Sequence, residues 1–94
     1  MTVVWSVRAV RNLALLRARM ARDRPDAARQ MAEAILASVD LLSAHPGLGK
    51  PGRIRGTREL VVPGTPYLVP YRVRGERIEI AAVFHGRQKW PRSW

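Results

Sequence analysis

The sequence of 94 residues contains no cysteine, and its only histidines are His45 and His85. The absence of thiols excludes a disulfide scaffold, a thiolate zinc site and a cysteine nucleophile. The two histidines lie in unrelated segments with no acidic cluster beside them, so the sequence predicts no metal site. The serines match no nucleophile motif and the glycines match no phosphate-binding loop, so no cofactor is predicted either.

Long apolar runs are also missing, since none approaches the roughly 18 residues of a membrane-spanning helix. Residues 1–6 lack the charged start and apolar centre of a secretory signal. Hydrophobic residues make up 47% of the chain, which is ordinary for a globular protein and too many for a disordered one. We therefore expect one soluble domain spanning residues 1–94, located in the cytoplasm, with no membrane partner.

Acidic residues are scarce: seven stand against 17 basic ones, which gives a net charge of +10. Fifteen of the basic residues are arginine, whose planar guanidinium binds phosphate and carboxylate through paired hydrogen bonds. The excess charge is concentrated in residues 1–24 (+5), 45–58 (+4) and 87–94 (+3). This segregation favours a binding surface for a negatively charged macromolecule over a general arginine bias of composition.

Residues 7–22 have helical spacing, with Ser6 placed to cap the helix. One face is predicted to be apolar and to carry Val10, Leu13, Leu16 and Met20. The opposite face carries Arg8, Arg11, Arg19 and Arg22, with Leu15 among them. A leucine inside a basic face favours contact with a partner over an ordinary solvated surface.

A second helix is predicted over residues 25–44, because Pro25 suits a first helical turn and apolar residues recur at helical spacing. Its apolar stripe comprises Ala28, Met31 or Ala32, Ile35, Val39 and Leu42. The short gap between the two helices allows only an antiparallel hairpin. Prolines and glycines in residues 45–52 end the second helix.

The remainder alternates as strands over residues 58–62, 67–73 and 77–84, which are expected to form a three-stranded antiparallel meander joined by an N-terminal strand. Ile78, Ile80, Ala82 and Phe84 are predicted to share one face of the last strand. Pro70 cannot donate a ladder hydrogen bond, so it predicts a free edge or a bulge. The order strand, helical hairpin, meander is α+β architecture.

Basic and aromatic residues are the remaining candidates for chemistry. Lys50, Arg53, Arg55 and Arg58 lie on the approach to the sheet, and His85, Arg87, Lys89 and Trp90 lie at the end of its last strand. Adjacent strands could bring both groups to one edge, where they could hold RNA phosphates and stabilise phosphoryl transfer. His85, with an intrinsic pKa of about 6.5, could move the proton. The alternative is that the arginines bind a partner's carboxylates and His85 is a packed strand-end residue.

A set of motifs runs in order along nearly the whole chain. They are Trp5, PDAA at residues 25–28, HPG at 45–47, GTRELVV at 56–62, Tyr67, YRV at 71–73, VFHGRQ at 83–88 and Trp90-Pro91. In this order and at this length, the chain resembles the RelE/ParE superfamily of bacterial type II toxin–antitoxin toxins. The resemblance implies a curved antiparallel sheet under a helical hairpin, which agrees with the architecture predicted from residue spacing.

The resemblance also implies a growth-inhibiting toxin that a co-expressed antitoxin holds inactive. The ParE-like branch of the superfamily inhibits DNA gyrase, whereas the RelE-like branch is a ribosome-dependent endoribonuclease that cleaves messenger RNA without a metal. In that RNase branch an arginine follows the aromatic that opens the middle strand, and a tyrosine lies late in the chain. Here Leu68 follows Tyr67, and residues 88–94 contain no tyrosine. The ParE-like branch, acting by binding, is therefore favoured.

The candidate residues divide by hypothesis. A nuclease would use Arg58, His85 and Arg87 as catalytic residues, and Lys50, Arg53, Arg55, Lys89 and Trp90 would bind the RNA or another target. An acidic antitoxin, disordered until it binds, is expected to form a hetero-oligomer through Trp5, Arg8, Arg11, Leu15, Arg53 and Arg55. A third hypothesis is a nucleic-acid-binding module in which Trp90 and Trp94 stack on bases.

Overall fold

The computed structural model describes residues 1–94 as one α+β unit, which confirms the predicted fold class. The elements are β1 (Thr2–Trp5), α1 (Val7–Ala21), α2 (Pro25–Asp40), the 3₁₀ turn η1 (Leu41–Ser43), β2 (Lys50–Pro51), β3 (Arg58–Val61), β4 (Tyr67–Arg74), β5 (Arg77–Ile80) and β6 (Phe84–His85). Residues 86–94, which we call the tail, follow β6 without regular structure. Neither helix is both long enough and apolar enough to cross a membrane.

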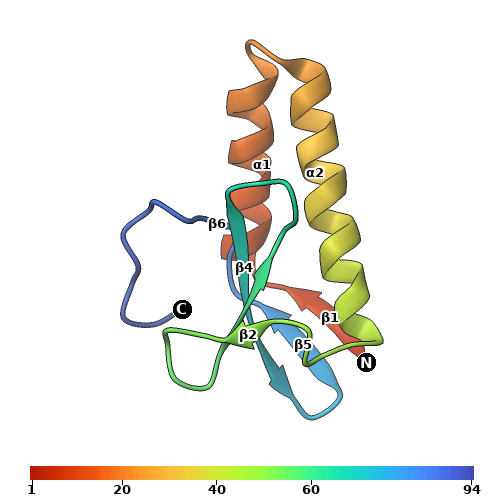
Figure 1. Ribbon diagram of the computed structural model, residues 1–94, viewed down its shortest axis with the longest axis vertical. Coiled ribbons are helices and arrows are strands. Elements are labelled where there is room, and N and C mark those ends of the chain that lie inside the picture. Colours follow the sequence, from red (N-terminus) through yellow and green to blue (C-terminus); the bar gives the residue numbers. More distant parts are fainter.

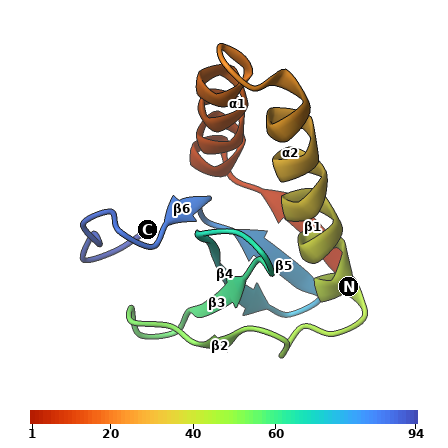
Figure 2. The same ribbon diagram turned by 45° about the horizontal axis from the view of Figure 1, so that its top comes forward.

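The strands form one sheet in the order β1-β5-β4-β3-β2, and β6 also pairs with the central strand β4. β1 runs parallel to β5, so the N-terminal strand joins the meander, and every other pair is antiparallel. Helices α1 and α2 form the predicted hairpin, which projects beyond the sheet (Figure 1). The turned view in Figure 2 shows the hairpin at the top and the edge strand β2 at the edge of the sheet farthest from it.

The hydrophobic core lies between the helical hairpin and the sheet face beneath it. Its buried members include Ile35, Val39 and Leu42 from the helical segment and Val69, Tyr71, Ile78 and Ile80 from the sheet. Burial of each large aliphatic side chain stabilises the fold by roughly 1.5–3 kcal/mol. The stripe predicted for α2 is confirmed as buried, because Ala28, Ala32, Ile35, Val39 and Leu42 are all buried and the last three belong to this core.

Helix α1 begins where the sequence predicts because Ser6 caps it. The Ser6 Oγ accepts a hydrogen bond from the N–H of Ala9 at 3.0 Å. Leu16 packs against the core as predicted, but the prediction for Val10 is wrong, since its side chain is 53% exposed. Ala9 is fully buried instead. Its single methyl group lets the first turn lie close to the sheet, and the next residue then points about 100° away.

Pro70 lies in the middle of β4 and produces the bulge that the sequence allows. Its carbonyl accepts a hydrogen bond from the N–H of Ala81 at 2.9 Å, but proline has no N–H with which to return one. The Ala81 carbonyl accepts from the Ser6 hydroxyl instead, at 2.9 Å. Regular pairing therefore stops at Tyr71–Ile80 and resumes at Leu68–Phe84, with one extra residue on the β5–β6 side.

Because of this bulge, two predictions about the last strand are wrong. A continuous strand over residues 77–84 is wrong, because β5 and β6 are separate strands. One extra residue reverses the side-chain alternation, so Phe84 shares a face with Leu68 and not with Ile80. His85 is correspondingly turned toward the helical side of the sheet, where it lines a groove beside α1.

Tyr71 fixes the loop that links the helices to the sheet. Its hydroxyl donates to the carbonyl of Pro46 and accepts from the N–H of Gly49, each at 2.8 Å. Position 49 requires glycine, because a Cβ there would lie 2.7 Å from the Tyr71 ring. Burial raises the pKa of the Tyr71 hydroxyl, and the bond from Gly49 together with the nearby Arg58 charge opposes this effect.

We expect Tyr71→Phe to lower the free energy of unfolding by about 1–2 kcal/mol, because it leaves the Gly49 N–H and Pro46 carbonyl without this partner. Urea unfolding followed by circular dichroism measures the change. Tyr67→Phe is the matched control, since the Tyr67 hydroxyl has no hydrogen-bond partner to lose. Equal losses in the two variants would contradict this role for Tyr71.

Candidate interaction site

The sheet face turned away from the helices, which we call the outer face, carries two arginines of β4. Arg72 and Arg74 alternate along the strand with the buried Tyr71. Glu79 on β5 lies opposite Arg72 in the register, but its carboxylate pairs with Arg74, 3.2 Å from Nε to Oε1. Arg72 has no acidic group within ion-pair distance, so it adds an uncompensated positive charge to this face.

The loop between β2 and β3 is closed by its own hydrogen bonds and by a buried carboxylate. The Gly52 N–H donates to the Thr57 carbonyl at 2.8 Å. Glu59, only 1% exposed, accepts from the Arg53 N–H at 2.7 Å through one oxygen, and its other oxygen lies 3.9 Å from Arg53 Nε. The loop therefore fixes the direction of Arg53, while Arg55 at its tip is exposed.

Three aromatic rings of β6 and the tail form a cluster beside this loop. The ring centroids of Phe84 and Trp90 are 4.9 Å apart, those of Phe84 and Trp94 are 5.2 Å apart, and the two tryptophans are 5.4 Å apart. The Arg53 guanidinium lies 4.0 Å from the Trp90 ring centroid, and that of Arg8 lies 5.8 Å from the Trp94 centroid. Cation–π contacts of this kind bring the loop, the start of α1 and the tail to one surface.

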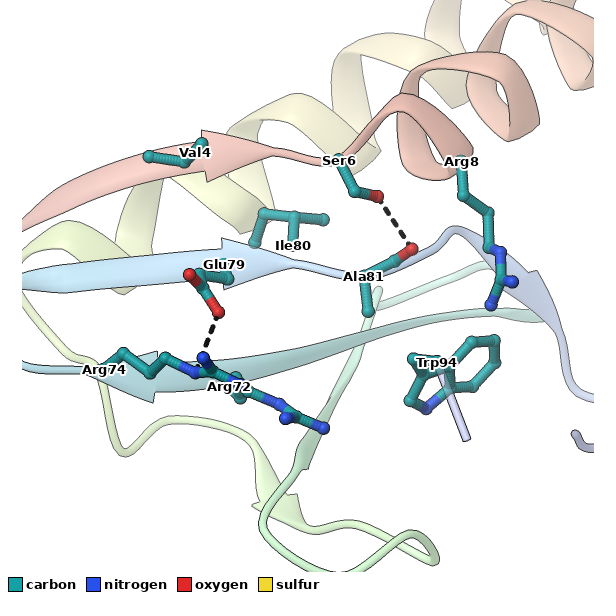
Figure 3. Close-up of a pocket in the computed structure, with 9 residues that line it drawn as sticks. All are labelled: Val4, Ser6, Arg8, Arg72, Arg74, Glu79, Ile80, Ala81 and Trp94. Carbon is teal, nitrogen blue, oxygen red and sulfur yellow. Dashed lines mark hydrogen bonds and ion pairs between the residues drawn. The ribbon is translucent and has the colours of Figure 1, made fainter. Parts of the chain in front are cut away.

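A pocket of about 440 Å³, the outer pocket, opens on this surface. Its walls carry Arg8, Arg72 and Trp94, and its floor includes Ile80 and Ala81 (Figure 3). The indole N–H of Trp94 is buried and has no hydrogen-bond partner. Positive charge and an aromatic wall thus occupy the same concavity.

A second groove of about 560 Å³ lies between α1 and β6, and we call it the α1–β6 groove. Its apolar lining is Leu15, Leu16, Met20, Tyr67 and Val83, and its polar lining is Asn12, Arg19, His85 and Gln88. Leu15 is 53% exposed, as its position inside the basic face predicts. Burial raises the pKa of the Tyr67 hydroxyl, and the Arg19 charge opposes this effect. The groove therefore combines an apolar lining with the positive charge of Arg19.

The three residues proposed as catalytic do not meet in one site. Arg58 pairs in the register with Tyr71, whereas His85 pairs with Tyr67, four residues away on β4 and hence about 13 Å along the strand. The Arg58 guanidinium donates to the Gly49 carbonyl at 2.7 Å. Nδ1 of His85 accepts from the Arg87 N–H at 3.0 Å. No three His, Asp or Glu side chains are grouped so that they could hold a metal ion.

The other candidate residues are spread over several surfaces. Trp5 packs against the hydrophobic core, so only part of its ring is accessible. Arg11 is exposed on the face of α1 that also carries Arg8 and Leu15. Lys50 lies on the edge strand β2, and Lys89 is exposed in the tail.

Sequence reasoning missed Arg72 and Arg74 as members of the site. The block of residues 59–86 has no net charge, which hides the fact that alternation places these arginines on one face, opposite the buried Tyr71. That alternation could have identified them. The groove contacts of Arg19 and Tyr67 had no such signal, because they depend on the pairing of β6 with β4 and on how α1 packs beside them.

The sequence and the fold of this chain are similar to those of known toxins. The chain matches the family described as "ParE toxin of type II toxin-antitoxin system, parDE" over residues 3–90. It is 44% identical over 87 residues to "Putative toxin Y4kP" of Sinorhizobium fredii (strain NBRC 101917 / NGR234), covering 93% of this chain and 90% of that protein.

Two solved structures have the same fold. The chromosomal ParDE toxin–antitoxin system from P. aeruginosa matches with a TM-score of 0.82 and 26% identity, over 90% of this chain and 95% of that one. The toxin–antitoxin complex RelBE2 from Mycobacterium tuberculosis matches with a TM-score of 0.66 and 29% identity, over 89% and 95% of the two chains.

A helical hairpin over a small, mostly antiparallel sheet, with an arginine-rich surface, defines the protein as a toxin component of a type II toxin–antitoxin system. Within that class the chain belongs to the ParE toxin family. The resemblance found in the sequence motifs is thereby confirmed. An antitoxin is the partner that these structural relatives indicate.

Proposed function

We propose that this ParE-family protein is a growth-inhibiting toxin that acts by binding an essential target, DNA gyrase, and that a cognate acidic antitoxin neutralises it. The observation that supports this proposal is that most of the arginines have no acidic partner within the chain. Of the 15 arginines, only Arg29, Arg53 and Arg74 form ion pairs with the chain's own acids. The other 12 have no acidic partner within the chain, although Arg58 donates to the Gly49 carbonyl, so their positive charge can attract an acidic macromolecule.

The separation of Arg58 from His85 supports action by binding over RNA cleavage. A general acid–base reaction needs its proton-transfer group and its charge-stabilising groups within hydrogen-bonding reach of the same reacting atoms. Arg58 is engaged with the Gly49 carbonyl, and Arg87 is exposed beyond β6. No charged side chain is hydrogen-bonded to the His85 ring, which contacts the Tyr67 ring edge-on with centroids 5.4 Å apart.

A supercoiling assay with purified gyrase and purified toxin tests the target. We expect inhibition at micromolar toxin, and Arg55→Glu with Lys89→Glu is expected to raise the half-inhibitory concentration roughly tenfold or more, because both residues are exposed beside the loop and tail surface. Arg17→Glu with Arg24→Glu changes the net charge equally at exposed positions of the helical hairpin, and it should have a much smaller effect.

Absence of inhibition at micromolar toxin would remove gyrase as the target. Toe-printing of ribosomes on translated messages then tests the alternative endoribonuclease, which would produce new cuts in the ribosomal A site. Equal effects of the two charge-reversal pairs would instead show that net charge, and not this surface, determines inhibition.

The α1–β6 groove is the proposed binding site of the antitoxin. It is lined by Leu15 and other apolar side chains together with Arg19, so it suits a segment with apolar residues on one side and acids on the other. Arg8 and Arg11 continue the same basic face of α1 along the helix. The antitoxin is expected to order as it binds, with its acids facing this row of arginines.

A further inference from the structure

The outer pocket is separate from the α1–β6 groove proposed for the antitoxin, although its Arg8 also belongs to the arginine row on α1. Two of the pocket's positive charges are uncompensated. Arg74 is paired with Glu79 at 3.2 Å, which leaves Arg8 and Arg72 without an acidic partner. Figure 3 shows both guanidinium groups extending toward the side of the pocket that Trp94 forms. Two like charges directed into one concavity repel each other, and a bound anion would relieve this repulsion.

The position of Arg8 strengthens the case for an anion. Arg8 lies in the first turn of α1, where the helix dipole disfavours a positive side chain, and this turn contains no acidic residue. Its only recorded partner is the ring of Trp94, with 5.8 Å between the guanidinium carbon and the ring centroid. An anion between Arg8 and Arg72 would gain from both side chains and from the helix dipole.

The charge and the lining of the pocket define the ligand. A phosphate monoester carries nearly two negative charges at neutral pH, so one group matches the two free guanidiniums, whereas one carboxylate matches only one. Trp94 offers an aromatic surface for a base, and its ring is held by edge contacts with Phe84 and Trp90. The volume of about 440 Å³ lies within the usual range for small-molecule sites.

We propose that the outer pocket binds a nucleoside monophosphate, either free or as the phosphorylated end of a single strand. The phosphate lies between Arg8 and Arg72, and the base lies against Trp94. The remaining arginine, Arg74, is held by Glu79 and borders the pocket without a free charge. The site is distinct from the α1–β6 groove, since neither Arg8 nor Trp94 lines that groove.

Calorimetric titration of the purified toxin with AMP and GMP tests the proposal, with adenosine as the probe that lacks phosphate. Binding should weaken at least tenfold in Arg72→Gln and in Arg8→Gln, because each loses a charge-assisted hydrogen bond. Trp94→Ala should weaken AMP binding and leave inorganic phosphate binding nearly unchanged. Arg22→Gln, at an exposed position of α1 outside the pocket, is the matched control and should change binding less than twofold.

A 12-residue oligonucleotide with and without a 5′-phosphate distinguishes the two sources of the ligand. Preference for the phosphorylated oligonucleotide over AMP identifies a strand end, and equal binding identifies the free nucleotide. Adenosine binding as tightly as AMP, or an equal loss in Arg22→Gln and Arg72→Gln, would overturn the proposal. Tighter binding of an acidic peptide than of AMP would also overturn it and would assign the pocket to a protein partner. None of these results depends on gyrase inhibition, so the two proposals fail separately.

Discussion

Replacing Ser6 by alanine is expected to lower the free energy of unfolding by about 1–3 kcal/mol. The Ser6 hydroxyl accepts from the N–H of Ala9 and donates to the carbonyl of Ala81. Loss of a helix N-cap costs about 0.5–2 kcal/mol, and loss of the part-buried hydrogen bond to Ala81 costs about 0.5–1.5 kcal/mol. Chemical unfolding measures the change, and Ser43→Ala, at an exposed serine, should remain within about 0.5 kcal/mol of the wild-type protein.

A double-mutant cycle with Pro70 isolates the contribution of the bulge. Pro70→Ala supplies an N–H beside Ala81, which already donates to the carbonyl of residue 70, and we expect this N–H to compete with the Ser6 hydroxyl for the Ala81 carbonyl. Ser6→Ala should therefore cost about 0.5–1.5 kcal/mol less in the Pro70→Ala background than in the wild-type one. If the two costs are equal, the Ala81 carbonyl is not the link between these residues.

Replacing Leu15 by glutamate is expected to weaken binding of the cognate antitoxin by roughly 10-fold to 100-fold. The proposed antitoxin segment buries Leu15 in the α1–β6 groove, and burial of a leucine contributes about 1.5–3 kcal/mol. The new carboxylate would in addition repel an acidic partner. Titration calorimetry or surface plasmon resonance gives the affinity, and co-expression in cells shows whether the variant toxin escapes neutralisation.

Leu36→Glu is the matched control for this experiment. Leu36 is 44% exposed on α2 and lies outside the groove, so the same change of charge and polarity should alter affinity less than threefold. Equal weakening in the two variants would show that overall charge determines the affinity. Unchanged affinity in Leu15→Glu would place the antitoxin on another surface, because a buried carboxylate in the groove could not be neutral in effect.

The elements of the fold follow from local signals that the sequence displays directly. Ser6 and Pro25 mark the starts of the two helices, and the buried stripe of α2 follows from its three- and four-residue spacing. The two-residue strand β2 had no such signal, since it is formed by Lys50 and Pro51 among glycines and exists only through its pairing with β3. Val10 shows the same limit within a helix, because helical periodicity predicts a face but not which flank the core covers.

The candidate site was harder to predict than the fold. Arg53 and Trp90 were both predicted from the sequence as binding residues, and in the structure the Arg53 guanidinium lies over the Trp90 ring. Arg58 and His85 were grouped because adjacent strands could have joined them, but their register partners on β4 lie four residues apart. Register depends on turn geometry and on bulges, and residue types alone do not encode it.

By itself, the sequence determined the class of fold, the starts of both helices, the segregation of positive charge and the resemblance to a toxin family, because these depend on local spacing and composition. The predicted end of the second helix at residue 44 is wrong, since α2 ends at Asp40 and a 3₁₀ turn follows. Tertiary structure alone decided which arginines share a surface and which face Phe84 and His85 occupy. The physical reason is that Pro70 has no N–H to continue the hydrogen-bond ladder, so the chain between β5 and β6 bulges by one residue opposite it. A shift of one residue exchanges the two faces of a strand.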